Sequence, residues 1–95
     1  MNSSMQFPQI AVRIIKEQEL IIGPLAWGEA RKVSGLNIDE SKNVVTFAGD
    51  DKDIINRLVA QYERIFGKAS HEVCKEAVQD LIAEMPPEEV PSSLK

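Results

Sequence analysis

Apolar residues recur at helical spacing in two stretches between residues 50 and 85, with polar residues between them. The first stripe contains Ile54, Ile55, Leu58, Val59, Tyr62, Ile65 and Phe66. The second contains Val73, Cys74, Ala77, Val78, Leu81, Ile82 and Met85. A spacing of i, i+3, i+4 and i+7 places each set on one face of a helix. Both faces are too apolar for water, so we expect a C-terminal helical hairpin that packs on the N-terminal half of the chain.

Residues that start and stop helices flank both stripes. Asp50 or Asp51 can cap the first helix, and Gly67 can end it in a left-handed conformation. Ser70 is a natural N-cap for the second helix. Two consecutive prolines at 86–87 cannot continue a helix. The pattern therefore predicts one helix up to Gly67 and another over residues 70–85.

The segment 7–22 fits two structures. As a helix, it places Ile10, Ile14 and Ile21 on one side, and its central polar residues are good helix formers. As two strands, it alternates at Ile10, Val12 and Ile14 and would turn back near residues 16–18. We favour the helix and keep an N-terminal β-hairpin at 9–22 as the alternative.

Glycine and proline divide the region that follows. Gly23 and Pro24 mark a bend, and Pro24 suits the first position of a second helix. Gly35 would end that helix. Two short β-prone runs then predict a hairpin over residues 36–48. An isolated hairpin is only marginally stable, so one of its faces must pack on the helices. In one register, that face carries Leu36, Ile38, Val45 and Phe47.

These elements predict an α+β fold in one small domain. It has three or four helices, the β-hairpin near 36–48 and the C-terminal helical hairpin. We expect residues 1–6 to be a flexible N-terminus, 7–85 to form the single globular domain, and 86–95 to be an extended tail containing proline and serine. Ninety-five residues leave little room for a second core.

Composition argues for a protein that acts on neither nucleic acid nor membranes. The net charge of −4 repels phosphate backbones, so nucleic acid is an unlikely partner. A small nucleic-acid-binding regulator with a wing-like hairpin remains the alternative; it requires Arg13, Lys16, Arg31 and Lys32 to converge on one face. The apolar run 20–27 is too short to span a bilayer. A lone cysteine cannot form an internal disulfide, and residues 1–8 do not resemble a signal peptide, so a cytoplasmic location is expected.

His71 and Cys74 are the weak candidates for a metal site or for catalysis. They lie three residues apart on the last predicted helix, which would let both approach one ion. A structural zinc needs four ligands, and the chain has no second His or Cys. A catalytic thiol must be exposed, whereas Cys74 falls on an apolar stripe. We therefore expect no metal, no cofactor and no enzyme activity, and an enzyme using this pair is the third hypothesis.

Four carboxylates follow each other at four-residue steps near the C-terminus. They are Glu72, Glu76, Asp80 and Glu84. A ladder of this kind can bind a cation or a basic partner, but it more often forms the solvated face of a helix. We interpret it as an acidic, solvent-facing surface.

The segment 7–27 carries a high apolar load for so small a chain. Its candidate interaction residues are Leu20, Ile22, Leu25 and Trp27. Trp27 could anchor a partner, but a core position at the helix bend is the favoured interpretation because tryptophan is highly buried on average. With no catalytic set in the sequence, we predict a non-catalytic protein–protein interaction or regulatory module. Its partner is another protein or a second copy, and we suspect a homodimer.

Overall fold

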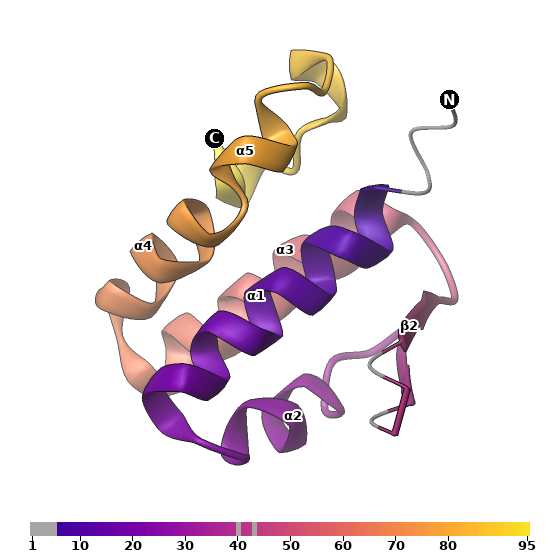
Figure 1. Ribbon diagram of the computed structural model, residues 1–95. Coiled ribbons are helices and arrows are strands. Elements are labelled where there is room, and N and C mark those ends of the chain that lie inside the picture. Colours follow the sequence, from indigo (N-terminus) through magenta and orange to yellow (C-terminus); the bar gives the residue numbers. More distant parts are fainter. Residues whose placement is uncertain (1–5, 40, 43) are drawn as a thin grey trace.

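The computed structural model describes residues 6–39, 41–42 and 44–95, and it has an α+β fold (Figure 1). The elements in chain order are α1 (Gln6–Ile22), α2 (Leu25–Ala30), β1 (Leu36–Asp39), β2 (Val44–Phe47), α3 (Asp51–Phe66), α4 (Lys68–Ala77), α5 (Gln79–Ile82), η2 (Pro87–Glu89) and η3 (Ser92–Leu94). The flexible N-terminus predicted for 1–6 lies outside the described residues except for Gln6, which begins α1. The predicted fold class is confirmed.

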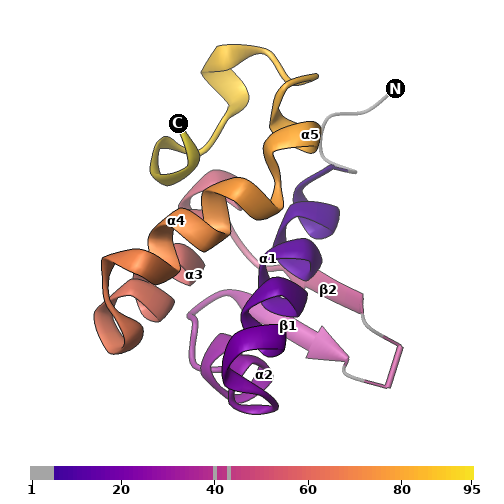
Figure 2. The same cartoon turned by 60° about the vertical axis from the view of Figure 1, so that its left-hand side comes forward.

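Helix α1 is central to the architecture. It packs against α2, β2, α3 and α4, so the hairpin and α2 lie to one side of it and α4 to the other (Figures 1 and 2). Ile10, Ile14 and Ile15 are fully buried, and Ala11 lies with them on the same helix face. The helix predicted for 7–22 is therefore confirmed, and the alternative N-terminal β-hairpin is wrong. Helical periodicity decided the outcome because a strand would have turned half of these residues to solvent.

Helix α3 forms the second layer of the core. The Asp50 side chain accepts a hydrogen bond of 3.0 Å from the Lys52 N–H and caps the helix. At the other end Gly67 takes a positive φ of 90°, and its N–H donates to the Glu63 carbonyl at 2.8 Å. Both predicted helix ends are confirmed in position, although the ψ of −179° gives Gly67 an extended rather than a left-handed helical conformation. The Tyr62 hydroxyl donates to the Ala26 carbonyl at 2.7 Å and so joins α3 to α2. In the predicted apolar stripe, Ile65 is exposed, whereas Phe66 is partly buried and packs against the core.

The second helix of the C-terminal hairpin differs from its prediction at both ends. α4 begins at Lys68, so Ser70 lies inside the helix, is buried, and does not cap it. The helix also breaks at Val78, whose φ of −120° and ψ of 11° are not helical. The single helix predicted over 70–85 is therefore wrong, and α4 and the short α5 replace it. Val78 is fully buried, so the chain changes direction at a core residue.

The two strands pair as the sequence predicts. They are antiparallel, with Leu36 opposite Phe47 and Ile38 opposite Val45. Leu36 and Val45 are buried, and Ile38 and Phe47 pack against the core, so this face lies toward the helices. β2 packs against α1, which supplies the support that an isolated hairpin lacks.

Helix α2 ends at Ala30, earlier than the predicted stop at Gly35. Turns then lead to Gly35, which has a φ of 88° and whose carbonyl accepts from the Ala48 N–H at 2.8 Å. Gly35 thus precedes the hairpin instead of capping the helix. No helix in the described part of the chain is long and apolar enough to cross a bilayer.

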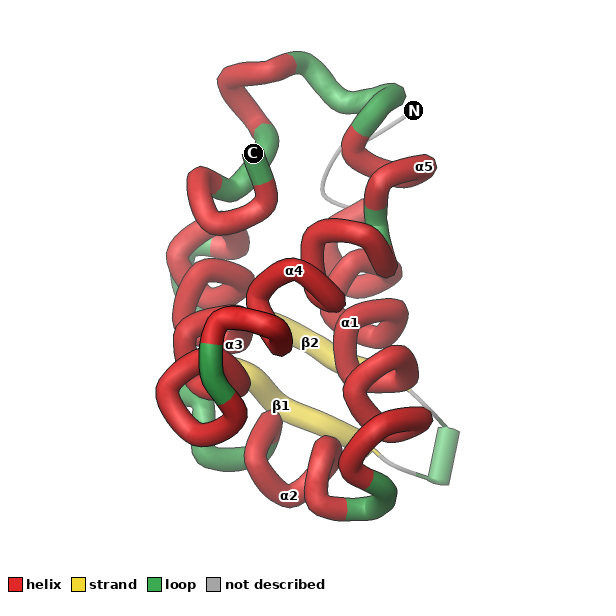
Figure 3. The backbone as a smooth tube through the Cα atoms, turned by 90° about the vertical axis from the view of Figure 1, so that its left-hand side faces the viewer, coloured by secondary structure: helices red, strands yellow, loops and turns green. Residues whose placement is uncertain are grey.

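The C-terminal tail is not extended as expected. It forms the short 3-10 helices η2 and η3, and η3 packs against α3 and α4. Pro91 and Leu94 are fully or almost fully buried. Figure 3 shows the chain arching away after α5 and returning to the helices at its C-terminus. Residues 91–94 therefore belong to the folded body rather than to a free tail.

Two glycine substitutions should have opposite effects on stability. A Cβ at Gly35 would lie 2.9 Å from Ile54 Cδ1 and 3.1 Å from the Ala48 carbonyl oxygen, and φ is already positive there. Gly35→Ala should therefore lower the free energy of unfolding by about 1–3 kcal/mol. A Cβ at Gly28, inside α2, meets nothing within 4 Å. Gly28→Ala should raise the free energy of unfolding by up to about 1 kcal/mol through helix propensity.

Urea unfolding followed by circular dichroism would measure both variants. A Gly35→Ala protein as stable as the wild type would contradict the described backbone at this turn. A destabilised Gly28→Ala protein would show that a surface outside this chain packs on Gly28.

Candidate functional site

The candidate interaction residues have different environments in the folded chain. Leu20 is 82% exposed and Leu25 is 61% exposed, whereas Ile22 is only partly exposed. Ile21, which is not among the predicted set, is 62% exposed. These residues follow one another across the bend at Gly23, whose φ is 72°. We call the exposed set of Leu20, Ile21 and Leu25 the α1–α2 corner.

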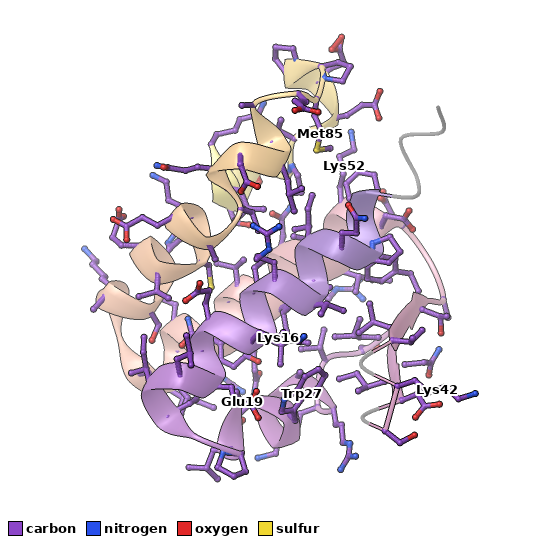
Figure 4. All side chains as sticks on the ribbon, in the orientation of Figure 1. Lys16, Glu19, Trp27, Lys42, Lys52 and Met85 are labelled. Carbon is purple, nitrogen blue, oxygen red and sulfur yellow. The ribbon has the colours of Figure 1, made fainter. Side chains whose placement is uncertain are left out.

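Trp27 is a core residue. Only 6% of it is exposed, so the core interpretation of Trp27 holds and it cannot serve as an exposed anchor. Its remaining surface contributes to an open hollow between α1 and α2. The hollow is lined by Arg13, Lys16, Glu17, Glu19, Leu20, Pro24 and Trp27. Figure 4 shows Lys16, Glu19 and Trp27 gathered in this region. The corner is thus continuous, through Leu20, with a hollow that has charged walls.

Ion pairs engage part of the charge around this hollow. Arg13 donates to both Asp80 oxygens, at 3.0 and 3.3 Å, and to the Ala77 carbonyl at 3.2 Å. Away from the hollow, the Lys32 ammonium in the turn after α2 lies 3.1 Å from the Glu29 carboxylate. Hydrogen bonds from Gln61 and then Lys32 lower the pKa of the Glu29 carboxyl. Two of the four basic residues required by the nucleic-acid alternative are therefore paired with carboxylates of the same chain.

Among the described residues of the hairpin, the strands carry no basic residue on their solvent-facing side, and Lys42 in the turn is the one cation. The solvent-facing strand positions are Asn37, Asp39, Val44 and Thr46. One of these is acidic and none is basic. A phosphate backbone laid along this face would meet no cation from the strands.

His71 and Cys74 point to different partners. Nδ1 of His71 lies 3.1 Å from Glu63 Oε1, and Nε2 lies 2.6 Å from the Ser93 carbonyl oxygen. Cys74 is fully buried, with its Sγ 3.4 Å from Gln18 Nε2. Within the described residues, no three His, Cys, Asp or Glu side chains are placed to hold a metal ion.

Burial also controls the chemistry of the Cys74 thiol. Desolvation raises its pKa to about 11, and the nearby Glu63 charge adds to the rise, although the hydrogen bond from Gln18 opposes it. A nucleophilic cysteine needs the opposite environment, which is exposed and electropositive. The thiol is therefore protonated and covered at neutral pH.

The acidic residues remain on the surface but do not form one continuous ladder. Glu72, Glu76, Asp80 and Glu84 are all exposed. The helix break at Val78 separates the first two from the others. Asp80 is paired with Arg13 across a sequence separation of 67 residues, which no local pattern could reveal. The acidic surface is thus partly neutralised by α1.

Gln18 is the internal polar residue that sequence reasoning missed. Its side chain is fully buried between α1 and α4, and Nε2 donates to the Ser70 carbonyl at 3.0 Å. Oε1 has no hydrogen-bond partner among the described residues. The available signal was position, since Gln18 lies four residues after Ile14 and so continues the buried face of α1. Its polar neighbours in the sequence concealed that signal.

This geometry belongs to a small α+β domain with a buried polar contact and one exposed apolar corner. Comparison of the chain with models of protein families, with curated proteins and with solved structures finds no match. The surface of this chain therefore has to carry any argument about its function.

Two substitutions at Gln18 should differ in their effect on stability, because one buries a charge and the other buries an apolar side chain. Gln18→Glu replaces the donor to Ser70 with a carboxylate in a buried site, so it should lower the free energy of unfolding by at least about 2 kcal/mol at pH 7. The loss should shrink at acidic pH, where the carboxyl group is protonated. Gln18→Met has a similar volume and removes the unpaired oxygen together with the donor to the Ser70 carbonyl, so the gain and the loss oppose each other and stability should change by less than about 1.5 kcal/mol.

Urea unfolding at pH 7 and pH 4.5 would test both variants against the wild type at the same pH. Equal stability of Gln18→Glu and the wild type at pH 7 would show that this side chain reaches solvent.

The Cys74 thiol should resist alkylation in the folded protein. A pKa about two units above its ordinary value of 9.0 lowers the thiolate fraction at pH 8 by about 100-fold. Because the folded pKa is the higher one, the associated stability is present below pH 9 and is lost as pH rises toward 11. Iodoacetamide labelling followed by mass spectrometry, with the urea-unfolded chain as control, would measure this protection. Rapid labelling without urea would contradict the buried position.

Proposed function

We propose that this protein is a non-catalytic protein–protein interaction module that self-associates through the α1–α2 corner. The observation that supports the proposal is the exposure of three large aliphatic side chains within residues 20–25, at one bend of the chain. Exposed aliphatic side chains that gather at one bend of the chain and are bordered by polar groups are typical of interaction sites.

A symmetric dimer is the simplest association for such a surface. Around a two-fold axis the same patch meets itself, so each Leu20 and Leu25 can be covered by the partner's copy of the corner. Fully burying a leucine or isoleucine side chain contributes roughly 1.5–3 kcal/mol. Three such residues on each side would be opposed by an association cost of about 4–15 kcal/mol. We therefore expect a weak dimer that depends on concentration.

The hollow beside the corner fits the rim of such an interface. Lys16, Glu17 and Glu19 line it together with Leu20. An apolar centre bordered by charged, solvated groups is the usual anatomy of a protein–protein interface. Both signs of charge are present, so the rim can pair with itself across a two-fold axis.

A role without catalysis is consistent with the two reactive residue types. The Cys74 thiol is buried, and the His71 imidazole is engaged by Glu63 and by the Ser93 carbonyl. The free, buried cysteine also suits a reducing compartment, and we propose a cytoplasmic location.

Light scattering over a range of concentrations would test the corner. The wild-type mass should rise from the monomer value of 10.6 kDa toward twice that value. The double variant Leu20→Gln, Leu25→Gln should remain monomeric, because burying polar glutamine side chains at the corner gives no hydrophobic stabilisation of a dimer. Val44 is also exposed and aliphatic but lies on the hairpin, so Val44→Thr is the matched control and should associate like the wild type. A wild-type protein that stays monomeric up to millimolar concentration would overturn the proposal.

A further inference from the structure

The C-terminal segment 91–94 is held on α3 and α4 in the manner of a bound peptide. Two apolar side chains, Pro91 and Leu94, are buried at its ends. Between them, the Ser93 N–H donates to Asn56 Oδ1 at 3.0 Å, and the Ser93 hydroxyl donates to the same oxygen at 2.6 Å. His71 Nε2 meets the Ser93 carbonyl oxygen at 2.6 Å. Because a carbonyl can only accept, Nε2 carries a hydrogen in this contact.

The polar contacts bind the main-chain N–H and carbonyl groups of one residue of the segment, Ser93. Asn56 on α3 accepts from the Ser93 N–H, and His71 on α4 donates to the Ser93 carbonyl. Glu63, also on α3, has its Oε1 3.1 Å from Nδ1 of His71, a contact that holds the imidazole in place when that nitrogen also carries a hydrogen. Recognition by main-chain bonds together with apolar pockets for flanking side chains is how proteins bind short linear peptides.

The connection to this segment is long and largely exposed. Residues 83–90 form the arch that leaves α5 and returns to the helices (Figures 2 and 3). The arch is held by Met85, which is buried, and by the Lys52 ammonium, which donates to the Glu88 carbonyl at 2.9 Å. Its eight residues can span about 26 Å when extended. That reach equals the intermediate dimension of the 32 × 26 × 19 Å molecule.

We propose that the α3–α4 groove formed around Asn56 and His71 is a peptide-docking site that can bind segment 91–94 of a second copy of this chain. A second copy is the occupant because its tail offers the same proline, serine and leucine in the same order, so every contact is reproduced. Pro86 has φ and ψ of −58° and 140°, close to the polyproline conformation, which favours an extended hinge. Exchange of the two tails gives a reciprocal dimer with no new interface chemistry.

This docking site is separate from the α1–α2 corner, and the experiment keeps them apart. All chains carry Leu20→Gln and Leu25→Gln, which removes the corner. One chain adds Asn56→Leu and His71→Leu, giving a defective groove with an intact tail. The other adds Leu94→Asp, giving an intact groove with a tail that cannot bury its end.

Each of these chains should be monomeric alone, and their mixture should form a one-to-one complex. Only the mixture contains an intact groove together with an intact tail. Fluorescence anisotropy of one labelled chain titrated with the other measures this association, and circular dichroism confirms that each chain is folded. Folded chains that do not associate in the mixture up to millimolar concentration would overturn the proposal.

A peptide measurement keeps the proposal testable if the triple or quadruple variants do not fold. The full chain with the milder Leu94→Ala substitution is titrated with a labelled peptide of residues 86–95. Binding should be saturable, and a peptide with Leu94→Asp should bind at least tenfold more weakly. No saturable binding, or equal binding of a scrambled peptide, would show that the groove does not recognise this segment.

Discussion

The burial of one face of α1 is the constraint on which the rest of the structure depends. α2, β2, α3 and α4 all pack against this helix, and its isoleucines at 10, 14 and 15 are fully removed from water. The same face carries Gln18, whose amide binds the Ser70 carbonyl and so fixes the position of α4 relative to α1. A buried amide with one unpaired oxygen is costly unless the remaining contacts are good. The register between α1 and α4 is therefore set by polar geometry as well as by apolar packing.

Local patterns in the sequence specify much of this fold. Apolar periodicity indicates α3, Asp50 and Gly67 mark its ends, and alternation in the hairpin gives the face that packs inward. The errors arise where distant residues intervene. Ser70 is a good N-cap by residue type, but α4 begins two residues earlier, at Lys68. The Ser70 carbonyl instead accepts a hydrogen bond from Gln18, which lies 52 residues earlier in the sequence. The tail looks like a proline-containing extension, but Asn56 and His71 bind it. No local pattern encodes such contacts.

The candidate site, like the fold, could be predicted only where local sequence patterns decide the environment of a residue. The apolar load of segment 7–27 marked Leu20, Ile22, Leu25 and Trp27 as candidate interaction residues, and of these Leu20 and Leu25 are exposed while Ile22 packs against the core. Trp27 could not be assigned from composition, because a tryptophan at a bend can face either way until its neighbours are known. His71 and Cys74 share a helix spacing that suits a metal, but the turn of the helix places Cys74 in the core and His71 against the tail. Spacing establishes which residues can meet and leaves their partners undetermined.

The corner and the docked tail lie on different helices, which bears on how copies of the chain can assemble. The corner is at the end where α1 turns into α2, whereas the tail packs against α3 and α4 (Figure 1). A single two-fold contact at either place closes into a dimer. Two different two-fold contacts on one chain do not close unless their axes meet, so together they would generate larger or open-ended assemblies. Holding the tail in its own groove prevents this outcome, because it leaves the corner as the one surface for association. The contacts of Asn56 and His71 with Ser93 would then limit assembly size as well as stabilise the fold.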